Sequence, residues 1–128
     1  ALVFQNYNLI DYLTPLENLK LVNQKADSEI LERMGLEKGM ADRNIMHLSG
    51  GQQQRVAIGR ALVSSAPIVL ADEPTGNLDE ETTDEIIQIL KDVAHKDNKC
   101  VIVVTHSDQV AKAADVIYQL KDKTLIKK

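Results

Sequence analysis

Two acidic side chains directly follow an apolar run in the middle of the chain. Residues 68–71 are Ile, Val, Leu and Ala, and the next residues are Asp72 and Glu73. In open α/β sheets, ligands gather beyond the carboxyl ends of the strands, so this position suits a metal-holding group and a group that reacts with water. The plainer alternative is a pair of acids that opens a loop. The other motifs of the chain favour the chemical interpretation.

A histidine occupies a similar position after the next apolar run. Residues 100–104 are apolar, and Thr105 and His106 follow them. An imidazole changes its charge near neutral pH, which makes His106 a candidate for contact with a reacting group. A loop histidine with structural contacts alone is the alternative. The run also contains the only cysteine, Cys100, which we interpret as a buried thiol in a reducing compartment.

A third candidate is the segment Ser49, Gly50, Gly51 and Gln52, called here the capped glycine motif. A Ser followed three residues later by Gln is a capping box, which predicts that a helix begins at this point. Glycines at a helix start allow close approach of the backbone and leave amide groups free for an anion. A flexible loop that begins a helix is the alternative interpretation.

The elements that must position these residues follow from caps and apolar periodicity. Helix starts are predicted at Thr14, with Pro and Glu behind it, at about Ser28 with a stop at Gly35, at Asp79 and at Ser107. Apolar runs predict strands at residues 1–4, 68–71 and 101–105, and a hairpin-like unit at 116–120 and 124–126. The alternation of helices and strands predicts an α/β fold with a parallel-sheet core whose strands are covered on both faces.

Composition limits the function classes. The 128 residues carry a formal charge of −4, with 44% hydrophobic and 27% charged residues, as in an ordinary globular protein. Mild acidity and 3% aromatic residues disfavour a nucleic-acid-binding module. The apolar runs are too short to span a bilayer, and the first residues do not have the pattern of a signal peptide.

Together these motifs resemble those of the ATP-binding subunits of ABC transporters. Residues 48–55 resemble the ABC signature, residues 68–73 the Walker B motif, residues 76–79 the D-loop, His106 the switch histidine, and Phe4-Gln5 the Q-loop. The motifs occur in the family's order over essentially the whole chain. Residues 72–79 further resemble the branch that serves lipoprotein release, macrolide or peptide export, and cell division. The resemblance implies a partial P-loop NTPase (ABC ATPase) fold with a parallel-sheet core and a helical subdomain.

The resemblance also assigns roles to residues. It implies that Glu73 orients or deprotonates the attacking water, that His106 contacts the γ-phosphate, and that Asp72 holds Mg²⁺. Gln5 would sense both the metal and the phosphate. The residues that the resemblance assigns to ATP binding are Ser49, Gly50, Gly51, Gln52 and Asp79. ATP and Mg²⁺ are therefore the expected ligands, and Arg55 and Arg60 are expected to support the signature helix.

No G-x-x-x-x-G-K-[ST] phosphate loop occurs in the sequence. Because the family places that loop before the Q-loop, we interpret the chain as the C-terminal part of an ABC ATPase. Residues 1–5 would be the end of a core strand with the Q-loop, 6–47 the helical subdomain, and 48–128 the signature helix with the rest of the core. This part alone is expected to be inactive and to self-associate through open strand edges.

The expected partners are a transmembrane permease subunit and a second ATPase subunit in a homodimer, with no nucleic acid. The expected location is cytoplasmic, at the inner face of the cell membrane, without a membrane span of its own. Two alternatives stay open: a non-transport ABC ATPase, and a non-catalytic binding or dimerisation fragment. Chromosome-type members carry a long coiled coil between the Q-loop and the signature, and residues 6–47 contain no sustained heptads.

Overall fold

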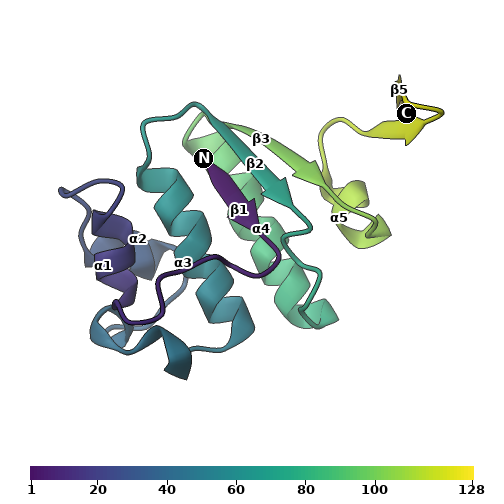
Figure 1. The fold of residues 1–128 in the computed structure, drawn as a ribbon. Helices are drawn as coiled ribbons and strands as arrows, with labels where there is room; N and C mark the ends of the chain where they lie inside the picture. The colour runs from purple at the N-terminus through teal and green to yellow at the C-terminus, as the bar shows by residue number, and fades with distance from the viewer.

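The computed structural model describes residues 1–128, and helices and strands alternate from α3 (Gly50–Val63) to β4 (Tyr118–Lys121) (Figure 1). The strands are β1 (Leu2–Phe4), β2 (Ile68–Asp72), β3 (Cys100–Val104), β4 (Tyr118–Lys121) and β5 (Thr124–Lys127). The helices are α1 (Pro15–Lys20), α2 (Ser28–Arg33), α3 (Gly50–Val63), α4 (Glu80–Lys96) and α5 (Asp108–Ala113), with short 3₁₀ turns η1 (Met40–Asp42) and η2 (Ile45–His47).

The first three strands form one parallel sheet in the order β1-β2-β3. Val3 lies opposite Ala71, and Ala71 lies opposite Val103, so β2 is the central strand. Because the three strands run in the same direction, their carboxyl ends lie at one edge of the sheet. This arrangement confirms the predicted α/β class with a parallel-sheet core.

Side-chain caps fix the helix starts where the sequence predicts them. Thr14 and Glu17 form a capping box before α1, and Ser49 and Gln52 form one before α3. Asp79 caps α4 through the backbone N–H of Thr82. These side chains satisfy N–H groups that have no partner within the helix, which is why the predicted starts are confirmed.

Helix α3 is shared by two apolar clusters. Toward the sheet, Ile58 packs with Val69 of β2 and Ile86 of α4. Toward the helices of residues 14–47, Val56 packs with a cluster that includes Leu19. Full burial of such a side chain contributes about 1.5–3 kcal/mol, so α3 joins the sheet and the helical segment into one unit.

The other face of the sheet is open, which corrects one prediction. Leu70 is 44% exposed and Val104 is 61% exposed, so these strands are covered on one face only. The prediction of a buried thiol at Cys100 is also wrong, because Cys100 is exposed on the same side. Alternate residues of a strand point to opposite faces, and α3 and α4 both pack on the face that contains Val69 and Ala71.

Strands β4 and β5 form the predicted antiparallel hairpin at the C-terminal end (Figure 1). Asp122 and Lys123 connect them with positive φ angles of 50° and 64°. Two left-handed residues form the type I′ turn that suits a two-residue hairpin loop. All residues of both strands are exposed. None of the helices has the length and apolar character needed to cross a membrane.

We predict that the chain self-associates through the open face and the free edge of β3. The exposed side chains of Ile102 and Val104 and the unpaired backbone of an edge strand favour pairing with a second copy. Light scattering should therefore detect dimers or larger species. The double variant Ile102→Lys, Val104→Lys should shift toward monomer, whereas Gln88→Lys, on an exposed position of α4, should not. A monomeric wild-type chain at high concentration would contradict the prediction.

Candidate functional site

The carboxyl ends of β2 and β3 bring Glu73 and His106 together. The backbone N–H of His106 donates to Glu73 Oε1 at 3.0 Å, and the hydroxyl of Thr105 donates to Glu73 Oε2 at 3.4 Å. The imidazole Nε2 lies 3.8 Å from Glu73 Oε1, and the ring is fully exposed. One oxygen of a carboxylate thus faces a solvent-accessible imidazole, an arrangement that can bind a water molecule and an anionic group side by side.

The backbone of Glu73 is held in an unusual conformation. Its φ angle is 48°, in the left-handed region that costs a non-glycine residue about 1–3 kcal/mol. The N–H of Glu73 donates to the carbonyl of Val104 at 2.8 Å, which ties the residue to the end of β3. This turn directs the side chain toward Thr105 and His106. Strain that the surrounding structure maintains is typical of functional positions.

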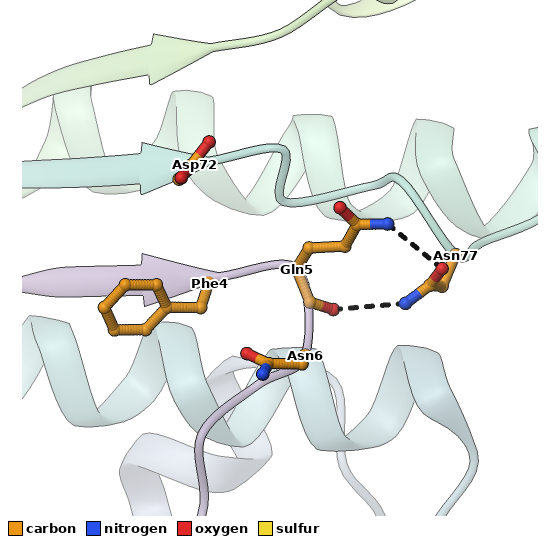
Figure 2. Close-up of a pocket in the computed structure, with 5 residues that line it drawn as sticks. All are labelled: Phe4, Gln5, Asn6, Asp72 and Asn77. Carbon is orange, nitrogen blue, oxygen red and sulfur yellow. Dashed lines mark hydrogen bonds between the residues drawn. The ribbon is translucent and has the colours of Figure 1, made fainter.

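A pocket of about 380 Å³ adjoins this pair at the ends of β1 and β2 (Figure 2). It is lined by Phe4, Gln5, Asn6, Asp72 and Asn77. Figure 2 shows Gln5 leaving β1 beside Asp72 at the end of β2. The Gln5 Nε2 donates to Asn77 Oδ1 at 3.1 Å, and Asn77 Nδ2 donates to the Gln5 carbonyl at 3.5 Å. The structure therefore places Gln5 and Asp72 in one pocket.

The donor set of this pocket fits a hard cation that is shared with a phosphate. Asp72 offers a carboxylate, and Gln5 Oε1 makes no hydrogen bond because only the nitrogen of its amide is engaged. Mg²⁺ prefers oxygen ligands and is commonly held by one or two carboxylates together with substrate phosphates. No group of three His, Cys, Asp or Glu side chains could hold a metal alone. Asp72 and Gln5 would thus hold Mg²⁺ only jointly with a phosphate.

The capped glycine motif forms the positive end of α3. Ser49 Oγ accepts from Gln52 N–H at 3.1 Å, and Gln52 Oε1 accepts from Ser49 N–H at 2.9 Å. The N–H groups of Gly50 and Gly51 make no hydrogen bond. Free N–H groups at a helix N-terminus attract anions through the helix dipole. The hydroxyl of Ser49 still has its proton to donate to such an anion.

Both glycines are also required by packing within the chain. A Cβ on Gly50 would lie 2.5 Å from the Tyr7 hydroxyl, and a Cβ on Gly51 would lie 2.5 Å from Thr82 Cγ2. The motif therefore touches the segment behind Gln5 on one side and the first turn of α4 on the other. Burial raises the pKa of Tyr7, in keeping with this close contact.

Asp79 lies beside the capped glycine motif. Its Oδ1 accepts from the Thr82 N–H at 2.7 Å, and hydrogen bonds from Thr82 lower the pKa of this exposed carboxyl. The preceding Leu78 would lie 3.4 Å from a Cβ on Gly50. Neither Asp79 nor the motif lines the pocket of Gln5 and Asp72. The predicted residues thus form two groups on one molecule.

Two arginines of α3 support the structure, as the sequence predicts. Arg55 donates to the Gly35 carbonyl at 3.2 Å and pairs with Glu85. Arg60 donates to the Asn8 carbonyl at 2.8 Å, and burial lowers its pKa. These contacts join α3 to α2, α4 and the segment that follows Gln5.

Sequence analysis did not single out two residues that hold the site. Asn77 holds Gln5, and Thr105 holds Glu73. Both are small polar residues inside the motif strings that attracted attention for other reasons. Asn77 follows Gly76 and Thr105 precedes His106, so their positions could have indicated a role in the site. Their hydrogen-bond partners, however, are distant in the sequence.

Comparison with known proteins identifies the family of the chain. A family model described as "ABC transporter" matches residues 1–76. An ABC transporter ATP-binding protein of Methanocaldococcus jannaschii, MJ0796, is 46% identical over 94% of the chain and 57% of its own length. The lipoprotein-releasing system ATP-binding protein LolD of Rickettsia prowazekii is 42% identical over 93% of the chain and 58% of its own length. The macrolide export protein MacB of Bartonella henselae is 40% identical over 97% of the chain and 20% of its own length.

The fold is similar to solved structures of the Methanocaldococcus protein. Its dimeric cassette superposes with a TM-score of 0.80 at 44% identity and covers 97% of this chain and 59% of that one. A dimer of the same protein in a post-hydrolysis state, bound to ADP and Pi, gives a TM-score of 0.77 with the same coverage. The chain thus spans 57% to 58% of the length of the two matched ATP-binding proteins.

We predict that Gly51→Ala destabilises the chain through its contact with Thr82. A new methyl group 2.5 Å from Thr82 Cγ2 forces the helices apart, which should lower the free energy of unfolding by about 1–3 kcal/mol. Thr82→Ser removes that methyl and keeps the backbone N–H that donates to the capping carboxylate of Asp79, so the double variant should recover at least half of the loss. Urea unfolding of the four proteins measures this. An unchanged loss in the double variant would show that the clash lies elsewhere.

Proposed function

This chain belongs to the ABC transporter family, and from that premise we propose that it is part of an ATPase subunit in which Glu73 activates water against the γ-phosphate of ATP. The observation that carries the proposal is the cluster at the carboxyl ends of the parallel strands. Glu73 lies within hydrogen-bond reach of Thr105 and of the backbone of His106, and Asp72 and Gln5 share the adjoining pocket.

In the proposed reaction, the oxygen of a water molecule bonds to the γ-phosphorus while the bond to the bridging oxygen of ADP breaks. Glu73 orients the water and accepts its proton, because a carboxylate held at the strand ends can act as a general base. His106 contacts the γ-phosphate through its exposed ring. Mg²⁺, when bound with the nucleotide by Asp72 and Gln5, would neutralise phosphate charge. The products are ADP and inorganic phosphate.

The capped glycine motif is proposed to act on nucleotide held by a second subunit. Three observations support this: the motif does not line the Gln5 pocket, its Gly50 and Gly51 N–H groups are free, and the solved relative is a dimer. Ser49 and these N–H groups would meet the γ-phosphate at the positive end of α3. Gln52 would hold Ser49 in place, and Asp79 would connect the two ATP sites.

The helical segment is proposed to contact a transmembrane permease. Residues 6–47 carry α1, α2 and the 3₁₀ turns around their own apolar cluster, and α3 joins this cluster to the sheet. Residues 1–5, 6–47 and 48–128 would thus be a strand end, a docking segment and a catalytic core. The protein would work at the cytoplasmic face of the membrane as a homodimer with its permease. Movement of the docking segment would couple hydrolysis to transport, with lipoproteins or macrolides among the candidate cargo classes of the relatives.

The other candidates are a non-transport ATPase of the same family and a non-catalytic fragment that binds or dimerises. The hypothesis of a non-catalytic fragment rests on the fact that these 128 residues contain no G-x-x-x-x-G-K-[ST] phosphate loop. The hydrolysis measurements below separate it from the ATPase.

We predict that changes at the two acids affect ATP binding differently in the complete gene product. Glu73→Gln should keep ATP binding and lower turnover by about 100-fold or more, because the amide preserves shape but accepts no proton. The ATP-bound dimer should then accumulate in gel filtration with MgATP. Asp72→Asn should weaken Mg²⁺-dependent binding as well as turnover.

Steady-state hydrolysis and calorimetry with MgATP measure both effects. Gln109→Asn serves as the control, because Gln109 contacts Glu80 and Asp84 away from the pocket. Near-normal turnover in Glu73→Gln would assign the base to another residue.

A further prediction concerns the 128 residues alone. They should bind MgATP with a Kd above about 0.1 mM and show no turnover, because they offer no lysine-bearing phosphate loop to hold the β- and γ-phosphates. Isothermal titration calorimetry tests this directly. Micromolar binding would show that the residues described here suffice as a nucleotide site.

A further inference from the structure

A buried glutamine of α3 joins the two loops that carry the proposed site. Gln54 is 0% exposed. Its Nε2 donates to the Phe4 carbonyl at 3.1 Å and also to the Pro74 carbonyl. These acceptors are 50 and 20 residues away in the sequence. One side-chain amide therefore connects three segments that meet only in the folded chain.

Both acceptors are direct neighbours of proposed site residues. Phe4 precedes Gln5 at the end of β1, and Pro74 follows Glu73 after the end of β2. No other donor reaches the Pro74 carbonyl, whereas the Phe4 carbonyl also accepts from the Tyr7 N–H at 3.2 Å. The amide thus holds the two carbonyl groups at one point, and without it the Pro74 carbonyl would have no hydrogen-bond partner.

The oxygen of the Gln54 amide argues against a role in which the side chain only fills space in the core. Gln54 Oε1 is buried and has no hydrogen-bond partner. An apolar side chain of the same shape would fill the space without burying an unpaired acceptor. The useful property of Gln54 in this place is therefore its pair of N–H donors, which an apolar residue does not supply.

We propose that Gln54 is a positioning residue that couples the capped glycine motif to Gln5 and Glu73. The motif begins α3, and Gln54 lies in the same helix. A shift of α3 when its N-terminus meets an anion moves the carbonyls of Phe4 and Pro74 with it. The proposal rests on the proposed function, because it concerns the same ATPase site.

The principal test is Gln54→Met in the complete gene product, with Gln88→Met as the matched control on α4. Gln88 is exposed, and its side chain donates a hydrogen bond to Asp92 within the same helix. Gln54→Met should lower kcat by about tenfold or more, since misplacement of a catalytic group by about an ångström can cost up to about 100-fold. The Kd for ATP should change less than about twofold, because the side chain does not face the nucleotide. Wild-type kcat in a folded Gln54→Met protein would overturn the proposal.

The variant Gln54→Glu keeps the test decisive if the methionine variant does not fold. Its carboxylate repels both carbonyls, whereas its protonated form donates to one of them. Burial raises the pKa of such a group, so kcat relative to wild type should rise as the pH falls from about 8 to about 6. A flat ratio would overturn the proposal.

Amide hydrogen exchange in the 128-residue chain separates this proposal from the proposed function. In Gln54→Met, the N–H of Glu73, which bonds to Val104, should exchange at least about fivefold faster, beyond any change in the interior of α4. Uniform acceleration would mean a general loss of stability and would overturn the proposal. If the wild-type protein shows no hydrolysis that depends on Glu73, the proposed function is refuted. The exchange result would still decide the role of Gln54.

Discussion

The parallel register of the three core strands is the constraint on which the site depends. Phe4 lies opposite Asp72, and Asp72 lies opposite Val104, so the residues that follow these three emerge at one edge of the sheet. Gln5, Glu73 and Thr105 are those residues. A slip of one residue in either pairing would turn the side chains to the opposite face and separate the carboxylate from the imidazole. The packing of β2 against α3 and α4 therefore also determines that the side chains of the candidate site meet at this edge.

Local signals made much of this architecture predictable. Thr14, Ser49, Asp79 and Ser107 cap helices because their side chains bond to N–H groups within three residues, a relation that the sequence contains. The covering of the sheet was not predictable in this way. An apolar run such as residues 68–71 indicates a strand, but it does not say which elements pack on each face. The exposure of Leu70 and Cys100 follows from that tertiary fact.

The candidate site shows the same division. The sequence predicted that Glu73 and His106 each follow the carboxyl end of a strand, and the structure brings them together because the parallel strands end at one edge. The residues that support the site act across distant segments: Thr105 bonds to Glu73, Asn77 bonds to Gln5, and Gln54 bonds to the carbonyl of Phe4. The glycines illustrate the combination: Gly50 and Gly51 offer free N–H groups to an anion and also leave room for Tyr7 and Thr82. The start of α3 is thus packed against the segment that follows Gln5 and against the first turn of α4.

The central claim is that the Glu73 and His106 pair faces the terminal phosphate of bound ATP. Nuclear magnetic resonance of the His106 ring in the complete gene product tests it most directly, because that ring is fully exposed and free to meet a ligand. The ring resonances should shift when a non-hydrolysable MgATP analogue saturates the protein, and MgADP should leave them near their free positions. Equal shifts with both nucleotides, or no shift at saturation with the analogue, would contradict the account.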